Sequence, residues 1–172
     1  RNSMIPGFHD QMQCAIKKGE NNSNISSIII YGEGNFFCAG GDLNSLKKRR
    51  EMSVEERHIT LNQLNKTILA IRECSKPTIA AVEGGAAGAG VSLAMACDFL
   101  IMADNAFFSL AYVKIGLTRD GGVTKLLAEV LTKQQLAEMS LLGNKVYANQ
   151  LNNFGMINIL TQKNLVKNEA IE

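Results

Sequence analysis

The chain has 172 residues, a length that favours one domain and lets it bury a sizeable core. Hydrophobic residues make up 46% of the sequence, and 18 basic against 16 acidic residues leave a net charge of +2, which argues against nucleic acid as the main partner. Because the chain has no apolar run of the ~18 residues that span a membrane, no signal-peptide pattern and no metal-ligand spacing, we expect a cytoplasmic protein with no membrane partner and no metal.

Helices and buried strands alternate along the chain. In order, apolar periodicity predicts a helix over about residues 8–18, a strand at 27–31, a helix at about 55–75, a strand at 78–82, a helix at 91–96 and a strand at 98–102. Gly19 is expected to end the first helix, and Leu61 to lie on the apolar stripe of the second. This alternation indicates an α/β fold with a largely parallel sheet, without a visible linker or internal repeat.

A glycine-rich loop, Gly84 to Gly90, follows the 78–82 strand. It is not a dinucleotide fingerprint, because Leu93 occupies the third glycine position, and no Lys-Ser or Lys-Thr pair follows to make a P-loop. Free N–H groups where the next helix starts, at about Gly88, would suit an anion or an oxyanion. Close packing of helix on strand favours the same small residues, so this loop alone leaves both interpretations open.

A second loop of the same kind, Ala39-Gly40-Gly41, precedes a helix-like stretch that starts near Asp42. Two such units can aim two backbone N–H groups at one point. A carbonyl oxygen that becomes an enolate oxygen needs this arrangement.

At these loops the sequence resembles the crotonase family, also called the enoyl-CoA hydratase/isomerase family. The resemblance extends in the family's order over nearly the whole chain, through residues 37–43, 76–84, 88–98, 106–109, 114–117, 120–122, 142–143 and 154–157. It implies a spiral of ββα units with flanking helices, in which residues 1–172 form the core domain without the family's N-terminal strand and C-terminal helices. It also implies an acyl-CoA thioester as substrate, with coenzyme A as part of that substrate and no separate cofactor, and a homotrimer or dimer of trimers.

The resemblance assigns the two oxyanion N–H groups to Gly41 and Ala89; many members have glycine at the second position. Contacts to the substrate are implied at Ala39, Gly40, Asp42, Leu43, Gly88 and Tyr112. Considered without the resemblance, Asp42 is more typical of a helix cap.

The fold does not determine the reaction, so the side chains at the site must. Hydratases of the family use two glutamates, and the corresponding positions here are Ser92 and Tyr112. Neither side chain can replace a carboxylate as acid and base near neutral pH, because its ordinary pKa is far too high. This argues against efficient hydration.

One carboxylate remains in the right segment, Asp120. The surrounding sequence resembles the isomerase branch that includes the phenylacetate-degradation isomerase, in which an aspartate here is the catalytic acid/base. A helix N-cap for the segment from Gly121 onward is the alternative role. Arg119 stands where proline is usual in the family; an arginine next to Asp120 could lower the pKa of Asp120 and weaken it as a base, and the sequence leaves this effect open.

These residues predict an enoyl-CoA isomerase that shifts a double bond through an enolate. An isomerase that rearranges the ring of epoxidised phenylacetyl-CoA is a close alternative. A non-catalytic acyl-CoA-binding member of the family is a third.

Overall fold

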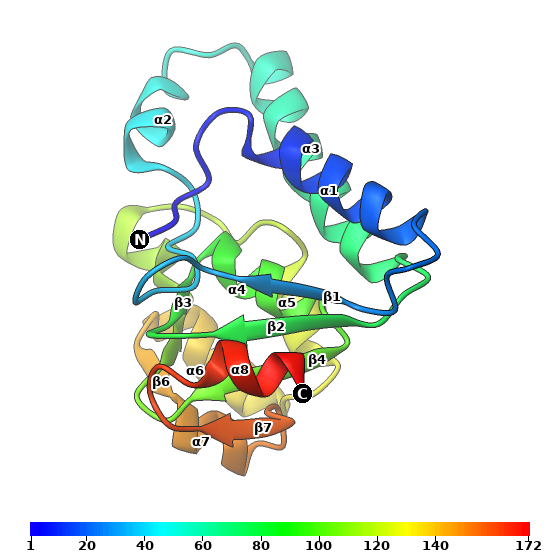
Figure 1. Ribbon diagram of the computed structural model, residues 1–172. Helices are drawn as coiled ribbons and strands as arrows, with labels where there is room; N and C mark the ends of the chain where they lie inside the picture. The colour runs from blue at the N-terminus through cyan, green and yellow to red at the C-terminus, as the bar shows by residue number, and fades with distance from the viewer.

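Parallel strands rich in isoleucine, valine and alanine form the centre of the molecule (Figure 1). The computed structural model describes residues 1–172. Its main sheet has the order β1-β2-β4-β7 and contains β1 (Ile28–Tyr31), β2 (Thr78–Val82), β4 (Phe99–Ala103) and β7 (Ile159–Thr161), with every neighbouring pair parallel. A smaller sheet, in which β5 pairs parallel with β3 and antiparallel with β6, contains β3 (Ala86–Ala87), β5 (Phe107–Ser109) and β6 (Lys145–Tyr147).

Helices connect and cover the strands. They are α1 (Phe8–Glu20), α2 (Leu43–Lys48), α3 (Val54–Arg72), α4 (Ala89–Met95), the 3₁₀ turn η1 (Ala111–Ile115), α5 (Val123–Ala128), α6 (Lys133–Leu142), α7 (Ala148–Asn153) and α8 (Val166–Ile171). Figure 1 shows α1 and α3 side by side at one end of the molecule, next to α2, with α7 and β7 at the other end.

The chain climbs through successive turns that repeat one pattern. In the second turn β2 leads to β3 and α4, and in the third β4 leads to β5, η1 and α5. The first turn has only a reduced second strand, in which Cys38 bridges Ala86 in parallel. The expected ββα units are therefore present, although the sequence shows no internal repeat that corresponds to them.

Several predicted boundaries were wrong by a few residues. Gly19 lies inside α1, which continues to Glu20, and the helix predicted to reach residue 75 ends at Arg72. The strand predicted at 98–102 is shifted by one residue, to Phe99–Ala103; Asp98 directly before it donates its N–H to the Thr78 carbonyl, and its carboxylate accepts from Thr78 N–H and Oγ1.

The apolar stripe of α3 also differs from the prediction. Leu64, Ile68 and Ile71 are buried, whereas Leu61 is 39% exposed. Thr67 takes the remaining place on the buried face, where its hydroxyl is hydrogen-bonded to the carbonyl of Gln63 in the preceding turn.

The two glycine-rich loops are in direct backbone contact. Ala87 N–H donates to the Cys38 carbonyl at 2.9 Å, and a Cβ added to Gly90 would lie 2.3 Å from that oxygen. A Cβ on Gly40 would lie 2.6 Å from the Ala87 carbonyl oxygen. No side chain fits at either crossing, so glycine there holds the first and second turns of the spiral together.

We expect Gly90→Ala to lower the free energy of unfolding by about 1–3 kcal/mol, the usual cost of overpacking, because the atom it meets is backbone and cannot move aside. Gly19→Ala is the matched control in another helix, since its Cβ would meet the movable Cδ1 of Ile28 at 2.9 Å. Urea denaturation of the two variants measures the difference. Equal effects would show that the crossing is not tight.

Candidate active site

Two unpaired backbone donors lie at the crossing of the loops. Gly41 precedes α2, Ala89 is the first residue of α4, and the N–H of neither donates to another group of the chain. A Cβ on Gly40 would lie 3.2 Å from the Ala89 nitrogen, so the first loop runs directly past the second donor. Gly88, just before Ala89, has φ +53° and ψ −127°, a backbone conformation that side chains rarely permit.

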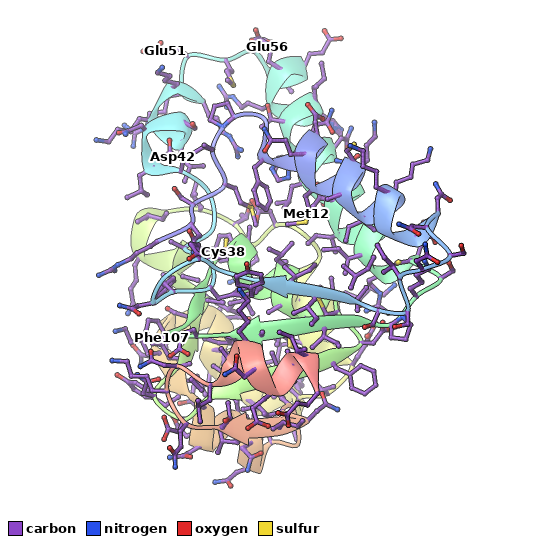
Figure 2. The ribbon with its side chains drawn as sticks, in the orientation of Figure 1. Met12, Cys38, Asp42, Glu51, Glu56 and Phe107 are labelled. Atoms are coloured by element: carbon purple, nitrogen blue, oxygen red, sulfur yellow. The ribbon has the colours of Figure 1, made fainter.

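The rim beside these donors is formed by the start of α2. Asp42 caps the helix, because its carboxylate accepts from Ser45 N–H at 2.8 Å and Ser45 Oγ at 2.9 Å. These bonds hold the pKa of Asp42 below its ordinary value. Figure 2 shows Asp42 on α2 and Cys38 on the loop below it. The cap is thus confirmed, while the substrate contacts implied for Asp42, for Ala39 and for the 63%-exposed Leu43 remain a prediction.

Asp120 lies in the loop between η1 and α5, together with the two side chains that stand at the hydratase positions. The Tyr112 hydroxyl donates to Asp120 Oδ1 at 2.8 Å, and Ser92 Oγ donates to the Asp120 carbonyl at 3.4 Å. Tyr112 also borders the second glycine-rich loop, because a Cβ on Gly88 would lie 3.7 Å from its Cζ. The third turn of the spiral thus brings its carboxylate beside the loop that carries Ala89.

Burial dominates the electrostatics of this pair. It raises the pKa of Asp120, against smaller opposing effects from the Tyr112 hydrogen bond and from the charges of Arg49 and His9. The pKa of Tyr112 is also raised, first by burial and then by the negative charge of Asp120. Tyr112 therefore keeps its proton as a donor, and Asp120 is a stronger base than an exposed aspartate.

The structure excludes the alternative role of Asp120 and shows where Arg119 points. Asp120 is not a helix cap, because α5 starts at Val123 with Gly122 in the N-cap position and no capping side chain. The Arg119 guanidinium donates to the Ser140 carbonyl at 2.9 Å, and the positive charges that lower the pKa of Asp120 are those of Arg49 and His9.

Sequence reasoning missed His9 and Arg49 as neighbours of this carboxylate. His9 Nδ1 is 3.1 Å from Thr67 Oγ1, and the charges of Arg49 and Asp120 also act on its imidazole. Burial and the charge of Arg49 lower the pKa of His9, and the nearby carboxylates of Asp10 and Asp120 oppose them. No local signal marks either residue, because His9 on α1 and Arg49 directly after α2 are both far from Asp120 in sequence.

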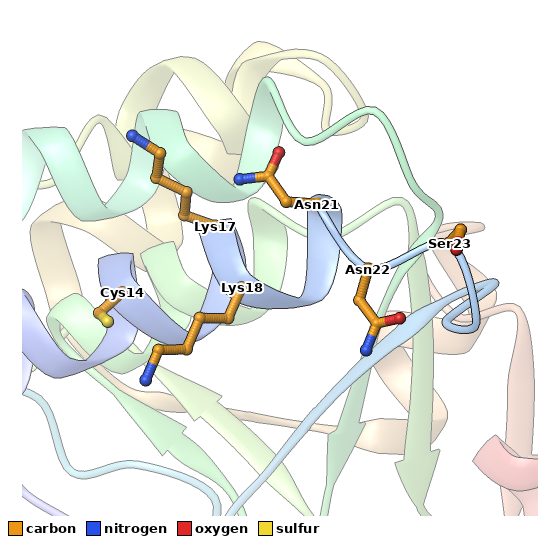
Figure 3. A pocket seen from close by; sticks show the side chains of 6 residues that line it. All are labelled: Cys14, Lys17, Lys18, Asn21, Asn22 and Ser23. Atoms are coloured by element: carbon orange, nitrogen blue, oxygen red, sulfur yellow. The ribbon is translucent and has the colours of Figure 1, made fainter.

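A hollow on the surface lies away from Asp120. It measures about 590 Å³ and lies at the C-terminal end of α1, where Figure 3 shows its lining side chains, Cys14, Lys17, Lys18, Asn21, Asn22 and Ser23. It holds no carboxylate. In the whole structure no three His, Cys, Asp or Glu side chains are grouped so as to hold a metal ion.

No helix of the protein combines the length and the apolar character that crossing a membrane requires.

The sequence model of the family described as enoyl-CoA hydratase/isomerase matches residues 1–172. The chain belongs to this family. Among curated family members, 1,2-epoxyphenylacetyl-CoA isomerase of Escherichia coli K12 is 34% identical over 91% of the chain, and 2,3-dehydroadipyl-CoA hydratase of the same strain is 30% identical over all of it. The chain spans 60% and 66% of their lengths.

Solved structures agree on the fold. The crystal structure of an enoyl-CoA hydratase from Polaromonas sp. JS666 matches with a TM-score of 0.95 and 38% identity, over 98% of this chain and 66% of that one. An enoyl-CoA hydratase from Bacillus anthracis matches with a TM-score of 0.89 and 26% identity, over 98% of this chain and 65% of that one. The crotonase-like spiral predicted from the sequence is confirmed.

Asp120→Asn is expected to raise the free energy of unfolding at pH values above the pKa of Asp120. Because burial raises the pKa of Asp120, wild-type protein is more stable when this carboxyl is protonated. The contribution of the protonated carboxyl to wild-type stability is present at low pH and is lost as the pH rises through the folded-state pKa. Asparagine has no charge to bury, so the gain should be about 1.4 kcal/mol for each unit by which the pKa is raised.

Urea denaturation at pH 7.5 and pH 4 measures the gain, which should shrink at the lower pH. Asp104→Asn, at an exposed turn between β4 and β5, is the control and should change little. A destabilised Asp120→Asn protein at pH 7.5 would contradict the electrostatic account.

Proposed function

We propose that the protein is an enoyl-CoA isomerase, which shifts a double bond of an unsaturated acyl-CoA through an enolate. The observation that carries the proposal is that one carboxylate, the partly buried Asp120, lies beside Tyr112 and Ser92, which stand at the places of the two hydratase glutamates. A double-bond shift needs one base that also returns the proton, whereas addition of water needs a pair of groups that hold and activate the water.

In the proposed reaction Asp120 takes a proton from the carbon next to the thioester carbonyl of a 3-enoyl-CoA. The electron pair moves into the carbonyl, and the negative charge that develops on its oxygen is stabilised by the N–H groups of Gly41 and Ala89. Asp120 then gives the same proton to the far carbon of the former double bond, and the charge returns to make the 2-enoyl product. No atom is gained or lost.

The Tyr112 hydroxyl has a positioning role in this scheme. Its bond to Oδ1 holds one carboxylate oxygen, which leaves the other oxygen, Oδ2, free to carry the proton between the two carbons. Substrate contacts by Ala39, Gly40, Asp42, Leu43 and Gly88, and assembly as a homotrimer or a dimer of trimers, belong to the same proposal.

A second candidate is supported by the relative named 1,2-epoxyphenylacetyl-CoA isomerase, at 34% identity. Ring rearrangement of an epoxidised phenylacetyl-CoA would use the same donors for the thioester oxygen. Hydratases lie at similar identity, so the side chains of this site, more than the names of relatives, favour isomerisation.

Asp120→Asn is expected to reduce kcat for a 3-enoyl-CoA by roughly 10²–10⁴-fold, the usual worth of a general acid/base, while the protein stays folded. A panel of 3-enoyl-CoA thioesters and epoxidised phenylacetyl-CoA, followed spectroscopically, measures turnover and separates the two candidates. Asp104→Asn should match wild type. Wild-type protein that binds every thioester and converts none would be an acyl-CoA-binding member instead, and an active Asp120→Asn protein would remove the carboxylate from the mechanism.

Wild-type protein should hydrate crotonyl-CoA several orders of magnitude more slowly than a hydratase, because neither Ser92 nor the strongly protonated Tyr112 can act as the missing carboxylates. Loss of the crotonyl-CoA absorbance, with the 3-hydroxyacyl product identified by chromatography, is the measurement. Rapid water addition would overturn the assignment.

A further inference from the structure

The loop that carries Asp120 has few backbone anchors of its own. Leu117 N–H donates to the Tyr112 carbonyl at 3.0 Å, and Val123 N–H donates to the Asp120 carbonyl at 3.3 Å. Between these two bonds, Thr118 and Arg119 use neither their N–H nor their carbonyl groups in a backbone hydrogen bond. The segment directly before Asp120 therefore depends on side chains for its position.

The Arg119 side chain supplies an anchor. Its Nη1 donates to the carbonyl of Ser140 at 2.9 Å, and Ser140 is a buried residue in the last turn of α6. Carbonyls in the last turn of a helix have no partner within the helix, and this end of the helix dipole attracts a positive charge. A charged donor at such a carbonyl makes a stronger bond than a neutral one.

The end of α6 is itself well fixed. Met139 accepts from Gly143 N–H at 3.2 Å, and the Gly143 carbonyl accepts from Ser109 Oγ of β5 at 3.3 Å. A Cβ on Gly143 would lie 2.8 Å from Val113, so the helix end also rests on η1. Arg119 therefore connects a loosely held loop to a rigid part of the third turn.

We propose that Arg119 is a positioning residue, which ties the Asp120 loop to the C-terminal end of α6 and so holds the carboxylate against the Tyr112 hydroxyl. This role rests on the proposed function of Asp120. The guanidinium is engaged with Ser140, so Arg119 acts through the loop and not on the reacting atoms.

Arg119→Met removes the charge and the donor but keeps an unbranched side chain. It should lower kcat by roughly 10- to 100-fold with little change in KM, because a small displacement of a catalytic group is costly whereas the thioester contacts lie elsewhere. Arg119→Lys should recover part of the loss, since an ammonium can still donate to Ser140. A purely structural role would reduce stability without this split between kcat and KM.

Lys76→Met is the matched control. Lys76 Nζ donates to the Gly19 carbonyl in the last turn of α1 at 2.7 Å, the same kind of bond at a site away from Asp120. This variant should keep wild-type kcat. If it loses as much activity as Arg119→Met, the effect is general loosening of the fold and the proposal is overturned.

Amide hydrogen exchange of residues 116–123 tests the tether without any substrate. Arg119→Met should accelerate exchange there and leave β2 and β4 unchanged. If wild-type protein shows no turnover, the proposed function fails, and this exchange measurement decides the anchoring on its own. Unchanged exchange in the loop, or unchanged kcat in an active enzyme, overturns the role of Arg119.

Discussion

The site depends on one steric constraint, the contact of two backbone loops with no side chain between them. Gly90 lies against the Cys38 carbonyl and Gly40 against the Ala87 carbonyl, and each leaves no room for a Cβ. The loops touch there, and the N–H groups of Gly41 on one loop and Ala89 on the other have no hydrogen-bond partner in the chain. Close packing of the loops is thus compatible with the proposed oxyanion role, since the glycines that allow the contact adjoin the two proposed donors.

Backbone and side chains divide the work in the proposed chemistry. In this proposal backbone N–H groups stabilise the charge on the thioester oxygen, and most substitutions leave these groups in place. Moving the proton falls to Asp120, in surroundings that raise its pKa and beside a tyrosine that holds one of its oxygens. A change of side chain at position 92, 112 or 120 would alter the reaction and leave the donors intact, which suits a family that contains both isomerases and hydratases.

Much of this could be predicted from the sequence, for physical reasons that also set the limit. β2 and α4 are local elements of strong apolar character, and the glycines between them stand where the backbone needs conformational freedom. The two elements and the loop between them could therefore be predicted from the sequence. The partner of Asp120 could not, because Tyr112 reaches it only when η1 folds back over the loop. The role of Arg119 could not be predicted for the same reason: Arg119 adjoins Asp120 in sequence, but its side chain extends to α6. His9 on α1 and Arg49 directly after α2 act on Asp120 through their charges, although both are distant from it in sequence.

The stacking of the turns also bears on the order in which the chain folds. Each strand of the main sheet pairs with the strand of the adjacent turn, so structure can propagate from one turn to the next, as in repeat proteins. Gly41 belongs to the first turn, Ala89 to the second and Asp120 to the third. During synthesis from the N-terminus the two glycine-rich loops can therefore make contact before Asp120 has emerged, and a chain folded only as far as α4 would already carry both proposed donors without the proposed base.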